Sequence, residues 1–176
     1  MDMRNQARRT FVVKMEHAGR YQFVSQASED GRPHGEPFRS DEPDPVGDAA
    51  APATPALLGA AIGHCLSASL LEALRHAHVD VRACETEVSS VVEPNAQGLP
   101  RIDHVEVVIR PSLGAPSPRT RRCEEVFERH CTVTSSVRAG VDVRVRVDWQ
   151  GASAGAVSGP ALEPAGHHLA GGAPLA

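Results

Sequence analysis

The feature that most constrains the fold is a long apolar segment, residues 55–76, with the pattern of a buried α-helix. Pro55 suits a first turn because the N–H that it lacks would have no partner there, and Thr54 can cap the helix. Cys65 lies near the middle. A helix with so wide an apolar stripe should be almost wholly buried, so the rest of the chain must form around it. The stripe has helical spacing and consists of Leu58, Ala61, Ile62, Cys65, Leu66, Ser69 and Leu70, widened by Leu57, Leu71 and Leu74.

Length, charge and cysteine usage bound the class of protein. A chain of 176 residues, 41% of them hydrophobic, is long enough for one domain with a sizeable core. The net charge is -4 and the 18 lysines and arginines are spread out, so we expect no nucleic-acid binding. No secretory or membrane-spanning pattern follows the polar N-terminus, so we expect no membrane association. The four cysteines are Cys65, Cys84, Cys123 and Cys131. They are widely spaced and include no CxxC pair, which favours the reducing cytoplasm as the compartment.

Alternating polarity predicts two β-hairpins. The first joins residues 11–15 to 21–25 through a turn at Gly19. The second joins residues 79–93 to a strand around 105–109, with a bulge expected where the alternation changes phase at Cys84 and Glu85. Hairpins imply antiparallel pairing within the sheets.

A second, shorter helix is expected over residues 119–130, followed by a strand over 141–147 in which valines alternate with charged residues. Strands outnumber helices, so the predicted fold class is α+β. We expect one domain over residues 10–149, a flexible N-terminus over 1–9 and a disordered tail over 150–176. The tail is rich in Gly, Ala and Pro and lacks the apolar surface needed to offset the entropy of ordering.

Three segments in a fixed order carry a family resemblance. They are Phe38-Arg-Ser-Asp-Glu-Pro43, the run Ala51-Pro-Ala-Thr-Pro that leads through the helix to Cys65, and Cys131-Thr-Val-Thr-Ser-Ser-Val. With 66 positions from Cys65 to Cys131, the chain resembles the OsmC/Ohr family of osmotically inducible protein C and organic hydroperoxide resistance proteins over about residues 10–148. The resemblance implies an OsmC-like intertwined homodimer, with antiparallel sheets wrapped around two central helices.

The resemblance also implies a thiol-dependent peroxidase. Cys65 would be the peroxidatic cysteine, which attacks an organic hydroperoxide and becomes a sulfenic acid. Cys131 would be the resolving cysteine, which condenses with it into a disulfide that an external dithiol reduces. No metal and no organic cofactor is implied.

An activating cation is part of the same expectation, because burial alone would raise the pKa of a thiol. In the family an arginine from the N-terminal strands lowers this pKa, and a glutamate at the start of the cysteine helix holds the arginine. Arg20, at the end of the first hairpin, is our candidate, ahead of Arg32 and Arg39.

The helix start departs from the family pattern. The chain reads Thr54-Pro55-Ala56, with no carboxylate where the family glutamate stands. Either another acid, such as Asp41 or Glu42, orients the arginine, or the arginine is unrestrained. The departure supports an alternative function, a non-catalytic OsmC-like dimer that binds a small hydrophobic ligand.

The remaining cysteines and histidines have simpler interpretations. Cys123 and Cys131 would lie about 12 Å apart on a continuous helix, too far for a disulfide. Cys84 and Cys123 are expected to be structural. His64 and His130 each precede a candidate cysteine, but adjacent helix residues point about 100° apart, and no zinc-ligand spacing occurs, so we expect no metal site.

Overall fold

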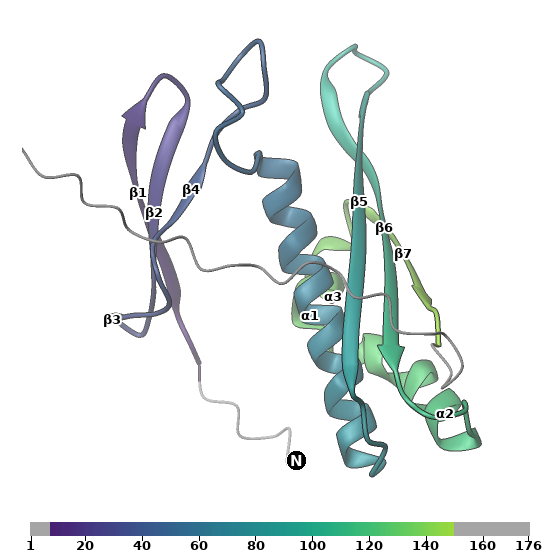
Figure 1. Ribbon diagram of the computed structural model, residues 1–176. Helices are drawn as coiled ribbons and strands as arrows, with labels where there is room; N and C mark the ends of the chain where they lie inside the picture. Colours follow the sequence, from purple (N-terminus) through teal and green to yellow (C-terminus); the bar gives the residue numbers. More distant parts are fainter. Residues whose placement is uncertain (1–7, 150–176) are drawn as a thin grey trace, which may run out of the picture.

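The computed structural model describes residues 8–149, which form two β-sheets and one long helix (Figure 1). Residues 1–7 and 150–176, which include most of the expected flexible end and the whole expected tail, lie outside the described residues. Sheet A contains β1 (Phe11–Gly19), β2 (Gln22–Glu29), β3 (Arg32–Pro33) and β4 (Phe38–Ser40). Sheet B contains β5 (Ala83–Pro94), β6 (Pro100–Ser112) and β7 (Asp142–Val147). The helical segments are α1 (Thr54–His76), α2 (Pro118–Val126), the 3₁₀ turn η2 (Phe127–His130) and α3 (Thr132–Val137).

Both predicted hairpins are confirmed. In β1–β2 the turn requires positive φ at Gly19 (126°), which glycine adopts without a steric penalty, and Arg20 follows with φ of 40°. The β5–β6 hairpin has its irregularity between Val91 and Val92, so the bulge expected at Cys84 is wrong. Cys84 pairs regularly with Pro111. The misleading signal came from Val79 and Val81, which alternate in the opposite phase but precede the strand, since β5 begins at Ala83.

The last strand departs from a purely antiparallel arrangement. β7 pairs with β6 in parallel, with Val105 opposite Val143 and Ile109 opposite Val147. A parallel neighbour requires a crossover connection, and the helical segment from α2 to α3 supplies it. Hairpin signals in the sequence did not reveal this pairing, because the helical crossover separates the two strands in the chain.

Helix α1 begins and ends where its pattern predicts, but it is less buried than expected. Its N-cap is Ala53, with no side-chain cap, so the expectation of a Thr54 cap is wrong. Only one stripe is buried, while Ala60, Ala61 and Ala68 are exposed in the single chain. By length and composition α1 could also span a membrane, with a mean hydropathy of 1.5. The buried stripe faces sheet B and the crossover helices and consists of Gly59, Ile62, Gly63, Leu66, Leu70 and Leu74.

Two glycines allow α1 to lie close against β5. A Cβ atom added to Gly63 would lie 2.6 Å from Val88 Cγ2, and one added to Gly59 would lie 2.8 Å from Ser90 Oγ. Both distances are shorter than van der Waals contact, so a larger residue at either position requires the facing side chain or the helix to move. A hydrogen bond between Ser67 Oγ and Thr86 Oγ1, at 2.6 Å, joins the same two elements.

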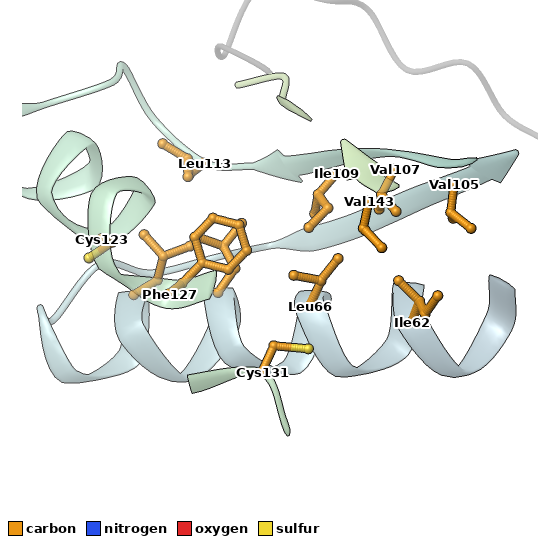
Figure 2. Close-up of a cluster of buried hydrophobic side chains, with 12 residues drawn as sticks. Ile62, Leu66, Val105, Val107, Ile109, Leu113, Cys123, Phe127, Cys131 and Val143 are labelled. Atoms are coloured by element: carbon orange, nitrogen blue, oxygen red, sulfur yellow. The ribbon is translucent and has the colours of Figure 1, made fainter. Parts of the chain in front are cut away.

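The core lies between α1, the inner face of sheet B and the crossover helices (Figure 2). Leu66 of α1, Ile109 of β6 and Phe127 of η2 are fully or almost fully buried in it. Cys131 is also fully buried in this cluster, beside α1 (Figure 2). The crossover helices therefore bring the second candidate cysteine to the helix that carries the first.

Sheet A stands beside this body and is joined to it by the loop that leads into α1 (Figure 1). The strand register places one set of apolar side chains on a single face of the sheet. On that face Met15 remains 56% exposed and Val13 51% exposed, and Ser25 Oγ is buried with no hydrogen-bond partner. The members of this apolar face are Phe11, Val13, Met15, Phe23, Ala27 and Phe38.

Candidate functional site

The two candidate cysteines are brought together although 66 positions separate them. Cys65 is half-buried on α1 and packs against the core cluster, and Cys131 is fully buried at the start of α3. Both are free thiols. Cys131 is the N-cap of α3, where its sulfur accepts a hydrogen bond from the Thr134 N–H at 3.4 Å. The Thr134 hydroxyl also lies 2.9 Å from this sulfur.

Several groups act on the Cys131 thiol. Burial raises its pKa, because the interior disfavours the charged thiolate. The Cys65 side chain raises this pKa further, as a hydrogen-bond partner and as a nearby charge. The hydroxyl and the N–H of Thr134 lower it. The net effect is a raised pKa, which favours the neutral thiol form of Cys131 in the reduced protein.

Arg20 lies at the β1–β2 turn, where the sequence placed it, and its guanidinium is held by the loop before α1. It donates to Asp48 Oδ1 at 2.6 Å, to the Pro45 carbonyl at 2.7 Å and to the Gly47 carbonyl at 3.0 Å. Asp48, rather than Asp41 or Glu42, thus forms its ion pair. The side chain is 48% exposed and keeps part of its surface free for another partner.

The same loop is organised by a buried carboxylate. Asp41 accepts hydrogen bonds from the N–H groups of Ala50, Glu42 and Asp48. The bond from Ala50 is the largest influence that holds the Asp41 pKa below its usual value, and burial opposes it. Gly47 completes the loop, because a Cβ there would collide with the Glu42 carbonyl. Asp41, one of the two acids expected to orient the arginine, therefore shapes the loop that does so.

Arg20 and Cys65 are not in contact within the described part of one chain. The loop that holds Arg20 leads directly into α1, and Cys65 lies eleven residues after Thr54. At about 1.5 Å per residue, this places Cys65 about 16 Å along the helix from its start. One chain alone therefore does not bring its guanidinium to its own Cys65.

A cavity of about 480 Å³ lies between the start of α1 and β5. Its walls are small or apolar on the helix side and carry hydroxyl groups on the strand side. Cys65 does not line it, although the two share α1. The lining residues are Ala53, Pro55, Ala56, Gly59, Ala60, Thr86, Val88 and Ser90.

The other candidate residues lie elsewhere. The Cys123 sulfur lies 3.4 Å from the Ala73 carbonyl, and Cys84 is half-buried on β5. Burial raises the pKa of both thiols, as expected for structural cysteines. His64 and His130 are exposed. Within residues 8–149, no group of three or more His, Cys, Asp and Glu side chains is placed to hold a metal ion.

Family comparison agrees with this arrangement of elements. The model of the OsmC-like protein family matches residues 47–146, which span the second half of the loop before α1, both candidate cysteines and most of sheet B. The chain belongs to the OsmC-like protein family. Hairpin β1–β2, with Arg20, precedes the matched region. No curated protein has a sequence that matches this chain.

Solved structures share the OsmC-like fold at low sequence identity. A protein from Psychrobacter arcticus, named for an osmotic-stress-induced detoxification response, has a TM-score of 0.64 at 16% identity, covering 84% of this chain and 100% of its own. The organic hydroperoxide resistance protein OsmC from Legionella pneumophila has a TM-score of 0.58 at 13% identity, with 79% and 96% covered. OhrB of Bacillus subtilis, an organic hydroperoxide resistance protein, has a TM-score of 0.57 at 17% identity, with 79% and 98% covered.

Sequence reasoning missed two residues that contact the candidate groups. Thr134 had a local signal, a hydroxyl residue three positions after Cys131 at the start of a helix, which is the spacing of an N-terminal cap. Asp48 had none, because only the folding of the loop against the β1–β2 turn brings it to Arg20.

Proposed function

We propose that this OsmC-like protein is a thiol-dependent peroxidase that reduces organic hydroperoxides. One observation carries the proposal: two free cysteines from distant segments interact in the core, one half-buried on α1 and the other fully buried at α3. A peroxide can reach the half-buried thiol, and the product can be captured by the buried one. The names of the structural neighbours from Legionella pneumophila and Bacillus subtilis agree with this substrate class.

The reaction then has two steps. The Cys65 thiolate attacks the terminal oxygen of the hydroperoxide, the O–O bond breaks, and the alkoxide takes up a proton and leaves as an alcohol. Cys131 next attacks the Cys65 sulfenic acid, the S–O bond breaks, and water is released as the disulfide forms. An external dithiol reduces the disulfide and restores both thiols. Neither step requires a metal or an organic cofactor.

The protein acts as an intertwined homodimer in this proposal. The apolar face of sheet A and the exposed alanines of α1 leave more apolar surface uncovered than a single chain usually shows. A second copy that inserts its helix between sheet A and α1 would cover both surfaces. The small side chains of Ala56, Ala60 and Ala61 allow two helix backbones to approach closely there.

The dimer also supplies the cation. If two α1 helices cross antiparallel near Ala60, Cys65 of one chain lies opposite position 55 of the other. That position adjoins the loop in which Arg20 is held by Asp48. Arg20 of the partner subunit would then face Cys65 and stabilise its thiolate. Asp48 would hold the arginine in place of the family glutamate that this chain lacks, because it fixes the guanidinium by a charge-assisted hydrogen bond.

Free thiols at all four cysteines suit a reducing compartment, and we propose that the protein works in the cytoplasm. The reductant would be a dithiol protein or small molecule from that compartment.

Peroxide titration tests the function. The reduced protein is treated with a small excess of cumene hydroperoxide, and its mass and free thiols are measured. We expect a loss of two thiols per chain and a disulfide mapped to Cys65 and Cys131. Cys65→Ser should abolish the loss, Cys131→Ser should stop at a sulfenic acid on Cys65, and Cys84→Ser should behave as wild type. Survival of all four thiols in the wild-type protein would rule out the peroxidase.

The cavity at the start of α1 supports a second candidate function. Its small and apolar walls, and Ala56 in place of a carboxylate, would suit a small hydrophobic ligand in a dimer without peroxidase activity. Ligand binding without any thiol loss in the titration above would favour this candidate.

A further inference from the structure

The Cys131 sulfur has two hydrogen-bonding groups of its own, both from Thr134. The hydroxyl oxygen lies 2.9 Å from the sulfur, and the backbone N–H donates to it at 3.4 Å. Cys131 and Thr134 are both fully buried. Bulk water therefore does not solvate this sulfur, and any charge on it depends on these protein groups.

The Thr134 hydroxyl can serve both protonation states of the sulfur. It accepts a hydrogen bond from the neutral thiol, and after a rotation about its C–O bond it donates one to the thiolate. The N–H can only donate. A Cys131 thiolate would thus receive two hydrogen bonds from one residue, and hydrogen bonds to a charged group are about twice as strong as neutral ones.

The influence of Cys65 on Cys131 changes when Cys65 is oxidised. In the reduced protein, the Cys65 side chain and its charge raise the pKa of Cys131. A sulfenic acid at Cys65 carries no thiolate charge, so that part of the opposition disappears. What remains is burial, which disfavours the Cys131 thiolate, against Thr134, which favours it.

We propose that the Thr134 hydroxyl is a catalytic group of the resolving step, where it stabilises the Cys131 thiolate that attacks oxidised Cys65. The inference rests on the proposed peroxidase function. Cys131 loses its proton, its sulfur forms the S–S bond, and the S–O bond of the sulfenic acid breaks. The departing hydroxide combines with the proton from Cys131 to give water, and the organic hydroperoxide is the oxidant for the whole sequence.

Rapid-quench kinetics separates the resolving step from peroxide attack. Reduced protein is mixed with one equivalent of cumene hydroperoxide. Cys65 sulfenic acid is trapped with dimedone and the disulfide is quantified by mass. The variants are Thr134→Val, which removes the hydroxyl at similar volume, Thr134→Ser, which restores it, and Ser136→Ala. Ser136 is the matched control, because its hydroxyl is on the same helix but exposed and bonded to the Thr132 carbonyl.

Thr134→Val should form the sulfenic acid at the wild-type rate and the disulfide more slowly. A lost hydrogen bond to a thiolate reduces its population, while the more basic sulfur becomes a better nucleophile, so the net slowing near neutral pH is roughly three- to tenfold. Thr134→Ser and Ser136→Ala should resolve within about twofold of wild type, the scatter expected of neutral changes.

The pH profile excludes a merely structural role. In Thr134→Val the midpoint of the resolving rate should move to higher pH, and at high pH, where Cys131 is fully ionised, the rate should equal or exceed that of wild type. Slowing by the same factor at every pH would mean that the substitution has displaced Cys131, and would overturn the proposal. So would an unchanged rate and midpoint.

A second measurement does not depend on peroxidase activity. Cys65→Ser places an uncharged side chain beside Cys131, as the sulfenic acid does, and the ¹³Cβ shift of Cys131 then reports its ionisation. Adding Thr134→Val should move this titration to higher pH. If wild type fails to consume peroxide but the titration still moves, the peroxidase function is wrong and the role of Thr134 at Cys131 stands. An unmoved titration overturns the Thr134 proposal in either case.

Discussion

Gly63 decides how closely α1 packs against β5, and its substitution by alanine tests the packing that positions Cys65. The added Cβ would lie 2.6 Å from Val88 Cγ2, whereas carbon atoms prefer about 3.5–4.0 Å. The helix or the strand must therefore shift by about 1 Å. Val88 is β-branched and has little rotamer freedom with which to move aside.

Two opposing effects set the magnitude. Alanine in place of glycine inside a helix stabilises it by about 1 kcal/mol. Overpacking a filled contact costs about 1–3 kcal/mol. We therefore expect Gly63→Ala to lower the free energy of unfolding by about 1 kcal/mol, whereas an unconstrained helical glycine would give a gain of similar size.

Urea unfolding followed by circular dichroism measures the free energy of unfolding at one fixed protein concentration, because the stability of the proposed dimer would depend on concentration. The matched variant is Val88→Ala, which removes the clashing methyl groups. The double variant Gly63→Ala/Val88→Ala should be more stable than the sum of the single changes predicts, with a coupling of about 1–2 kcal/mol. A stabilised Gly63→Ala with no coupling to Val88 would refute the close approach of α1 to β5.

Two further predictions concern the loop and the dimer. The folded-state pKa of Asp41 is lowered, so its contribution to stability is present above the ordinary carboxyl pKa of about 4 and is lost as pH falls below it. As pH falls through this range, the urea midpoint should drop more steeply for wild type than for Asp41→Asn. An equal dependence of the midpoint on pH in the two proteins would contradict the role of Asp41. Met15→Lys, on the apolar face of sheet A, should shift the proposed dimer toward monomer in analytical ultracentrifugation, while Val12→Lys on the opposite face should not. A Met15→Lys protein that dimerises as strongly as wild type would place the interface elsewhere.

Much of the fold could be predicted from local patterns. The helical spacing at residues 55–76 and the Gly19 turn each depend on side chains close together in sequence, so their signals survive in one chain. The parallel pairing of β6 and β7 could not be predicted this way, because residues about forty positions apart form it. The burial of α1 was overestimated because helical spacing gives the direction of the apolar stripe but not how much of it the rest of the chain covers.

The candidate site divides in the same way. The sequence alone, read with its family resemblance, determined that Cys65 is on the apolar helix, that Cys131 follows a second helical segment, and that Arg20 is at a turn. The resemblance also implied that Cys131 meets Cys65, and the tertiary structure places the two together. Only the tertiary structure decided that Thr134 contacts Cys131, and that Asp48 rather than Asp41 pairs with Arg20. The physical reason is that a thiol or a guanidinium takes its chemistry from what surrounds it within a few ångströms, and the fold assembles those surroundings from segments that the sequence keeps apart.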